Sequence, residues 1–278
     1  MVNHRYKGNS TYGAMKDIFN PLYDPRSANN VCIFGQLLLT DLIERLEGHC
    51  QLIQSNTDGL IVKLHGNEDE VIAICKEWEA RTGMGLGYDR MTKICQKDVN
   101  NYIAVFENGK IEAKGAYVKN LNNLDYDLAI VNKAVRDFLL NGSSVRRTVY
   151  QCQDFRMFQK VVKLSNKYKW VEHEQGLVKS ETFTLNGRWK FDLSKYGATV
   201  KFDNKAYRVF ASSDDNDGRL LKCKTTEKGD KKDKFANTPD KCFIFNDDLT
   251  GVEIPSKLDR EWYVELAKSR LRDFGVTI

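Results

Sequence analysis

The spacing of apolar residues along the first part of the chain predicts two helices followed by a hairpin. A short helical pattern covers residues 9–19, and a longer amphipathic pattern covers 27–47. Two short apolar runs, 51–54 and 60–64, have strand character and flank a polar turn at 55–59. This order places one acidic residue at the tip of a hairpin that a long helix precedes.

The pattern then predicts another helix and a run of strands. Asn67 and Glu70 have the spacing of a capping box, so a helix should begin there and run to about Arg81. Asn108-Gly109 indicates a hairpin turn. Three strand patterns surround that turn, at 88–94, 101–106 and 110–118. Helices beside antiparallel strands predict an α+β fold for this part of the chain.

The second part of the chain is mixed. Helical patterns occupy 124–140, shorter pieces of 143–160, and 259–273, while 160–202 is mixed and aromatic-rich. The segment 212–234 is polar and charged, and its only large apolar residues are Leu220 and Leu221. This composition predicts a mobile loop.

Composition narrows the class of protein without naming it. The 278 residues are enough for two modest domains. No apolar run approaches the roughly 20 residues that a membrane span needs, and the N-terminus lacks a signal-peptide pattern. The seven cysteines are scattered and form no C-x-x-C pair, which favours reduced thiols in a cytoplasmic protein over a disulfide framework or a zinc site.

Positive charge is concentrated in one region. The net charge is +5, and residues 119–190 contain 13 Lys or Arg against 7 Asp or Glu. A basic region of this kind suits a surface that follows phosphates, and it equally suits a solvated basic face without a ligand. Charge alone leaves both interpretations open.

The first chemical motif is Asn9-Ser10-Thr11-Tyr12-Gly13, at the start of a predicted helix. It resembles the N-S-x-Y-G core of motif B in family-B DNA polymerases. The resemblance implies that Asn9 and Tyr12 pack against the base and sugar of an incoming dNTP, while a cation binds its triphosphate. The family places a lysine four residues before the asparagine, and this chain has Arg5 there.

The second motif is Asn56-Thr57-Asp58-Gly59, at the predicted hairpin tip. It resembles motif C of the same family, D-T-D-S, whose carboxylates hold two Mg²⁺ ions for phosphoryl transfer. Asp58 matches the second aspartate and is therefore the candidate catalytic and metal-binding residue. The first aspartate is replaced by Asn56, which lacks the charge. Taken alone, this motif is more typical of an ordinary hairpin turn.

A third region resembles the K-x-Y segment of the polymerase palm, which contacts the primer–template duplex. The resemblance assigns DNA binding to Lys97, Tyr102, Lys114 and Gly115, where glycine would let DNA approach the backbone. The basic segment beyond it would track the duplex with positively charged and aromatic side chains; these are Arg146, Arg147, Lys160, Lys163, Lys167, Tyr168 and Trp170.

The order of the three motifs implies the C-terminal part of a phage-type family-B DNA-directed DNA polymerase. The implied fold class is α+β: a palm with an antiparallel sheet and a catalytic hairpin, then a largely helical thumb with extra strands. Residues 1–22 would end the fingers, 23–118 form the palm, and 119–278 form the thumb and C-terminal region. Primer–template DNA, dNTPs and Mg²⁺ are the implied ligands.

No segment resembles motif A, which carries another metal-binding aspartate. We therefore expect synthesis to need an N-terminal polymerase segment on another chain. Two alternatives stay open: a non-catalytic remnant that binds duplex DNA, and an unrelated α+β structural protein. A reverse transcriptase is disfavoured, because its hairpin carries two adjacent aspartates and Asp58 is followed by Gly59.

Overall fold

The computed structural model describes residues 9–119, 127–183, 189–202 and 204–278, with side chains described over these ranges except at 9–10 and 177–198. The chain forms two compact units. The first contains the residues up to Ile94 together with Ala104–Glu112, and the second contains Cys95–Ile103 together with everything from Ala113 onward. Among the described residues, every helix is too short or too polar to cross a bilayer.

The first unit begins with two helices, α1 (Asn9–Lys16) and α2 (Pro25–Leu46). Asp24 caps α2, since its carboxylate accepts a hydrogen bond of 3.0 Å from the backbone N–H of Ser27, and Pro25 occupies the first turn. The helix begins two residues earlier than its apolar pattern predicts, because this cap acts before the first apolar position.

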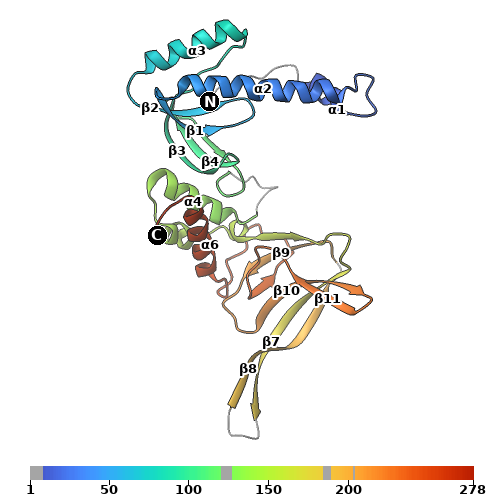
Figure 1. Cartoon of the computed structure of the whole chain (residues 1–278). Coiled ribbons are helices and arrows are strands. Elements are labelled where there is room, and N and C mark those ends of the chain that lie inside the picture. Colours follow the sequence, from blue (N-terminus) through green and yellow to red (C-terminus); the bar gives the residue numbers. More distant parts are fainter. Residues whose placement is uncertain (1–8, 120–126, 184–188, 203) are drawn as a thin grey trace. The chain divides into compact units, whose positions relative to one another are not determined.

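The hairpin and the next helix follow the predicted order. β1 (Cys50–Ser55) pairs antiparallel with β2 (Leu60–Leu64). Helix α3 (Glu68–Thr82) is capped by Asn67, whose side chain accepts from the N–H of Glu70 at 3.3 Å, and it ends at Gly83. Helix α3 lies beside α2 (Figure 1). The small core of the unit consists of Leu42, Leu46, Val71, Cys75 and Trp78.

A three-stranded sheet has the order β3-β4-β5. Its strands are β3 (Met91–Asp98), β4 (Asn101–Phe106) and β5 (Ile111–Lys114). The prediction of a strand to residue 118 is wrong, because Gly115 adopts a left-handed conformation with φ 93°. The N–H groups of Val118 and Lys119 turn back to the carbonyl of Gly115, at 3.4 and 3.1 Å.

Helices of the second unit pack on a core of aliphatic and aromatic residues. These are α4 (Ala129–Asn141), α5 (Val145–Gln151), a 3-10 turn (Phe155–Phe158) and α6 (Arg260–Asp273). The ring of Phe155 stacks on that of Phe210 at 4.1 Å, and Tyr263 meets Phe158 edge-on. The predicted start of α4 at 124 lies outside the described residues. All seven cysteines are free thiols in the structure.

Strands form the rest of the second unit. A three-stranded sheet has the order β12-β9-β6, from β6 (Lys160–Lys163), β9 (Ala206–Ala211) and β12 (Cys242–Ile244). A four-stranded sheet has the order β11-β10-β7-β8, from β7 (Trp170–Phe183), β8 (Trp189–Phe202), β10 (Asp217–Thr226) and β11 (Gly229–Lys234). The fold class is thus α+β with antiparallel sheets, as predicted, and strands occupy more of the part after residue 119 than the sequence indicates.

The predicted loop at 212–234 is wrong, because β10 and β11 occupy most of it. β10 pairs antiparallel with both β7 and β11, and Gly229 makes the turn with φ 103°. Leu220 and Cys223 are fully buried, while the charged residues of the segment other than Asp217 are partly or fully exposed. A few apolar positions are enough because Leu220 packs into a core that also contains Val171 of β7 and Val162 and Val209 of the neighbouring sheet.

Candidate functional site

The hairpin between β1 and β2 places Asp58 at its exposed tip. The turn is closed by a hydrogen bond of 3.0 Å from the N–H of Asn56 to the carbonyl of Gly59. The side-chain oxygen of Asn56 accepts a hydrogen bond from the N–H of Thr57. Asn56 therefore uses its oxygen to shape the turn, and Asp58 is the carboxylate that the tip presents.

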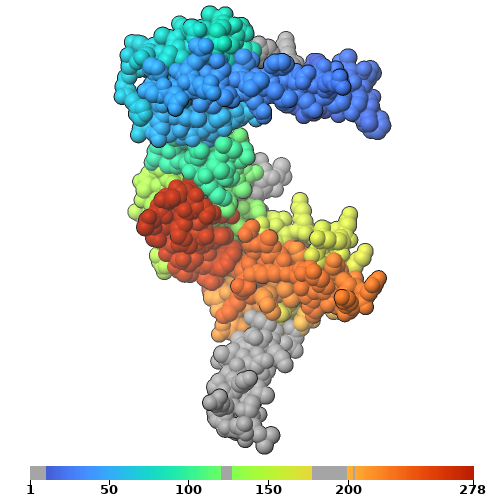
Figure 2. All heavy atoms as spheres, in the orientation of Figure 1, coloured from blue at the N-terminus to red at the C-terminus, as the bar shows by residue number. Residues whose placement is uncertain are grey.

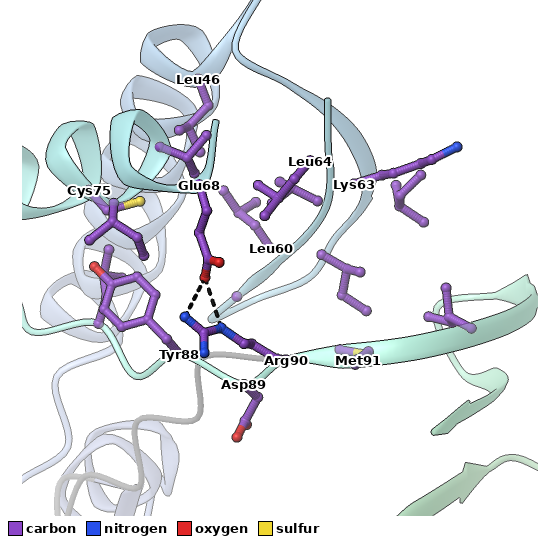
Figure 3. A pocket seen from close by; sticks show the side chains of 18 of the residues that line it. Leu46, Leu60, Lys63, Leu64, Glu68, Cys75, Tyr88, Asp89, Arg90 and Met91 are labelled. Atoms are coloured by element: carbon purple, nitrogen blue, oxygen red, sulfur yellow. Dashed lines mark hydrogen bonds and ion pairs between the residues drawn. The ribbon is translucent and has the colours of Figure 1, made fainter. Parts of the chain in front are cut away.

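Asp58 also lines an apolar cavity of about 520 Å³ within the first unit. Figure 3 shows this cavity between β2, the two helices and the start of β3. At its mouth Glu68 and Arg90 form an ion pair of 2.8 Å, and Asp89 lies next to that pair. Burial raises the pKa of Tyr88, another lining residue, to about 12, so its hydroxyl stays protonated at neutral pH.

Sequence reasoning missed Asp89, Glu68 and Arg90 as neighbours of this site. Glu68 comes from α3 and the other two precede β3, so only the fold brings them to one cavity. The available signal was the run Tyr88-Asp89-Arg90, which places a charged pair at the start of the strand predicted for 88–94.

The donor set for Mg²⁺ is incomplete in the part of the chain that the structure describes. Within those ranges no group of three or more His, Cys, Asp or Glu side chains is arranged to hold a metal ion. A site for two magnesium ions depends on several carboxylates, and the hairpin tip provides Asp58. The described residues therefore fit one ligand position of such a site and not the whole of it.

Helix α1 carries the motif-B residues. The hydroxyl of Tyr12 lies 2.9 Å from the Sγ of Cys32 on α2, and the ammonium of Lys16 lies 4.6 Å from the centre of the Tyr12 ring. Hydrogen bonding with Tyr12 raises the pKa of Lys16. Asn9 begins the helix, its side chain is outside the described set, and Arg5 lies outside the described residues. Lys16, which sequence reasoning missed, is thus a cation beside the aromatic ring of the motif.

The K-x-Y region lies around β3, β4 and β5. The ammonium of Lys97 is 4.4 Å from the centre of the Tyr117 ring and 3.8 Å from the carboxylate of Asp273. Tyr102 is only 1% exposed, and the ammonium of Lys114 lies 5.9 Å from the centre of its ring. In this arrangement Lys114 can face a ligand, whereas the ring of Tyr102 supports it from the interior.

Gly115 approaches its own chain closely. A methyl group built at this position would lie 2.8 Å from Cγ of Asn101 and nearer still to the carbonyl oxygen of Asn100. The Asn101 amide donates to the carboxylate of Asp98 at 3.0 Å, and this contact lowers the pKa of Asp98. The glycine thus accommodates the β3–β4 turn, which is a different neighbour from the DNA that the resemblance implied.

The two arginines of α5 have different interaction partners. Arg146 pairs with Glu261 and lies over the ring of Tyr150, with 4.6 Å between its guanidinium carbon and the ring centre. Arg147 is exposed and donates to the side chain of Gln151 at 3.3 Å. Part of the charge of Arg146 is therefore neutralised within the protein, whereas the guanidinium of Arg147 donates to a neutral side chain.

A group of lysines surrounds Tyr168, and we call Lys167, Lys222 and Lys224 the Tyr168 lysine cluster. Their ammonium groups lie 5.3, 5.0 and 5.7 Å from the centre of the ring. Tyr168 is 5% exposed and its hydroxyl donates to Asp233 at 2.7 Å. Sequence reasoning found Lys167 and Tyr168 but missed the two lysines of β10, which it had assigned to a loop.

Other members of the expected basic surface have different partners. Lys160 pairs with Asp127 at 2.9 Å and is largely buried. Trp170 donates its indole N–H to Glu172 at 2.8 Å, and Lys201 lies over the ring at 5.3 Å. The Tyr168 lysine cluster is therefore a stronger candidate for phosphate binding than Lys160.

Comparisons with known proteins point to one class of enzyme. No protein-family model matches the chain. The chain is 25% identical over 139 residues to DNA polymerase 1 of Saccharolobus solfataricus. This aligned region makes up 49% of this chain and 16% of that protein. The solved family B DNA polymerase from Pyrobaculum calidifontis is similar in fold, with a TM-score of 0.52 and 16% sequence identity over 97% of this chain and 32% of that one. The chain spans less than a third of either protein, and over nearly all its length it has a fold similar to part of a family B DNA polymerase.

Proposed function

We propose that this chain is the C-terminal part of a phage-type family B DNA-directed DNA polymerase. Its reaction would be template-directed transfer of a nucleotide from a dNTP to a primer 3′-hydroxyl. The observation that carries the proposal is the exposed Asp58 at the tip of an antiparallel hairpin, within a fold similar to that of a family B polymerase. A rigid hairpin is a suitable support for a metal-binding carboxylate, because its position depends little on loop motion.

The proposed roles follow the three motifs. Asp58 would be a Mg²⁺ ligand, and when bound the two ions would align the primer hydroxyl with the phosphates. Helix α1 would face the dNTP with Asn9 and Tyr12, and a cation would bind the triphosphate. Arg5 is the candidate cation from the motif, and Lys16 is supported by its position 4.6 Å from the Tyr12 ring.

The residues proposed to contact DNA all belong to the second unit. Lys97 and Lys114 would contact the primer–template duplex, with Tyr102 and Gly115 as supporting residues. Arg146, Arg147 and the Tyr168 lysine cluster would contact phosphates farther along. In domain terms, 1–22 would end the fingers, 23–118 would form the palm, and 119–278 the thumb. The setting would be the cytoplasm, where a phage replicates in its host.

The incomplete donor set supports a requirement for a second polypeptide. Asp58 is one carboxylate, and Asn56 is both uncharged and committed to its turn. The missing carboxylates would come from an N-terminal polymerase segment that carries motif A on another chain. The isolated chain should then bind primed DNA without extending it.

Primer extension tests this proposal directly. The chain is assayed alone and mixed with the purified polypeptide that is encoded immediately upstream, with primed DNA, dNTPs and Mg²⁺. We expect synthesis only in the mixture. Asp58→Asn should reduce the rate by about a hundredfold or more, because it removes a charge that stabilises the transition state.

Asp69→Asn is the matched control, since Asp69 is also an exposed carboxylate in the same unit but lies on α3. Its rate should stay within about twofold of the wild-type mixture, a change of less than about 0.5 kcal/mol in the barrier. Synthesis by the chain alone would contradict the need for a partner. Unchanged synthesis by Asp58→Asn would remove Asp58 from the mechanism. DNA binding without synthesis in either case would favour a non-catalytic remnant.

A further inference from the structure

The apolar cavity of the first unit lies where two sheets end. β2 has β1 on one side and, among the described residues, no strand on the other. β3 is likewise the outer strand of its sheet. All of β2 and Met91–Ile94 of β3 line the cavity (Figure 3). The cavity therefore separates two strand edges within the same unit.

The walls of the cavity are those of a protein interior. Its lining includes Leu42, Leu46, Ile61, Val62, Val71 and Leu86. Its polar lining includes the exposed Asp58, Asp89 and Arg90 and the partly buried Glu68. An apolar interior of about 520 Å³ exposed to water is costly, since apolar surface gains free energy when another apolar group covers it.

The strand edges specify the shape of a suitable occupant. An edge strand carries backbone N–H and C=O groups that can pair with a further strand. A two-stranded sheet such as β1–β2 is marginal by itself and gains stability from a third strand. One extended segment between β2 and β3 would hydrogen-bond to both edges and join the two sheets.

A second apolar surface in the same unit extends the contact area. Val31, Ile33, Phe34 and Leu37 of α2 are 57, 52, 64 and 59% exposed. Val31 and Phe34 are neighbours on the helix surface, and Ile33 and Leu37 are neighbours one row further round. Phe19, in the link between α1 and α2, is 92% exposed. Figure 2 shows this end of the unit, in dark blue, as a projecting arm. Exposed apolar side chains at this density indicate a protein interface.

We propose that the cavity receives an extended apolar strand of a second polypeptide, which pairs with β2 and β3 and continues over the exposed side of α2. The source of that strand rests on the proposed function: this chain covers 32% of the similar polymerase of known structure, so a polymerase of this fold has ample further chain to provide it. Alternating apolar side chains on the strand would fill the cavity, while its backbone N–H and C=O groups form hydrogen bonds with both edge strands.

Hydrogen exchange of the chain, free and mixed with the purified upstream polypeptide, tests the pairing. Backbone amides of Leu60–Leu64 and Met91–Ile94 should exchange about tenfold or more slowly in the complex, because strand pairing protects them. Binding is measured in parallel by calorimetry, without DNA or nucleotide.

A matched pair of variants locates the contact. Leu64 lines the cavity and is 39% exposed, so Leu64→Lys should be tolerated in the free chain. In the complex its charge would be buried without a partner, and the affinity should fall about a hundredfold or more. Leu52 on β1 is 43% exposed and does not line the cavity, so Leu52→Lys should change the affinity by less than about threefold.

Each result has a definite meaning. No complex, a complex without protection at both strands, or equal effects of the two lysine variants would overturn the inference. Protection that appears in the free chain on raising its concentration would identify a second copy as the occupant and would also overturn it. Synthesis in the mixture without strand protection would leave the proposed function standing alone. Strand protection without synthesis would support the docking site and count against the polymerase.

Discussion

Replacement of Gly115 by alanine tests whether this glycine serves the fold or a ligand. Its φ of 93° is a conformation that residues with a Cβ rarely adopt. The added methyl group would also meet the carbonyl of Asn100 and the side chain of Asn101, with Cγ of Asn101 only 2.8 Å away. To relieve that overlap, Asn101 would have to leave the carboxylate of Asp98, to which it now donates at 3.0 Å.

The expected cost has two parts. The left-handed backbone costs about 1–2 kcal/mol for a residue with a Cβ. The overlap with the β3–β4 turn adds about 1–3 kcal/mol, the usual range for overpacking. Gly115→Ala should therefore lower the free energy of unfolding by about 2–5 kcal/mol. Gly142→Ala is the control, because Gly142 has φ 69° in the same unit and nothing within 4 Å of an added Cβ.

Urea unfolding followed by circular dichroism measures both variants. Gly142→Ala should show only the backbone cost, about 1–2 kcal/mol. Equal losses for the two variants would refute the claim that Gly115 is needed for close approach within its own turn. A Gly115→Ala protein with wild-type stability and weakened duplex binding would instead restore the interpretation in which the glycine admits DNA.

Three further measurements test other parts of the second unit. Arg260→Met should lower the free energy of unfolding by about 2–3 kcal/mol in urea titrations, because its guanidinium donates to the carbonyls of Val149, Tyr150 and Cys152 at 3.0, 2.7 and 3.1 Å. Burial lowers the pKa of His173, so on acidification the imidazole takes up a proton in the unfolded chain before it does so in the folded chain. The free energy of unfolding should therefore fall as the pH drops through about 6.5. His173→Gln should flatten this dependence in urea midpoints measured over a pH series. The double variant Lys222→Ala, Lys224→Ala should reduce the salt dependence of duplex affinity, measured by fluorescence anisotropy. The slope of log affinity against log salt concentration should fall by about 0.9 for each phosphate that the protein no longer neutralises. An unchanged slope would exclude Lys222 and Lys224 from DNA binding.

Local signals were sufficient for the start of α3 and for the β1–β2 hairpin. Asn67 and Glu70 predicted the start of α3 because a capping interaction involves residues only three positions apart. The hairpin and its acidic tip were equally predictable, since alternation and a polar turn are short-range patterns. The position of Asp58 could thus be predicted from the sequence, and its catalytic role stays a prediction.

Long-range contacts explain what the sequence did not reveal. The segment 212–234 has too few apolar residues to form strands alone, and it does so because β10 pairs with β7 and Leu220 packs with Val171 and Val209. The Tyr168 lysine cluster combines Lys167 with two lysines of β10 that lie far along the chain, and no local pattern connects them. Sequence similarity suggested that Gly115 faces DNA, whereas its nearest neighbours are Asn100 and Asn101 of the adjacent turn.

Residue order and local chemistry alone established the α+β class, the cap of α3 and the hairpin that carries Asp58. These features depend on propensity, on alternation and on hydrogen bonds between residues close in sequence. Tertiary packing alone decided that Tyr102 is buried, that lysines gather around Tyr168, and that an apolar cavity separates β2 from β3. Burial is a property of all the segments that meet at one place, so no single stretch of sequence contains it.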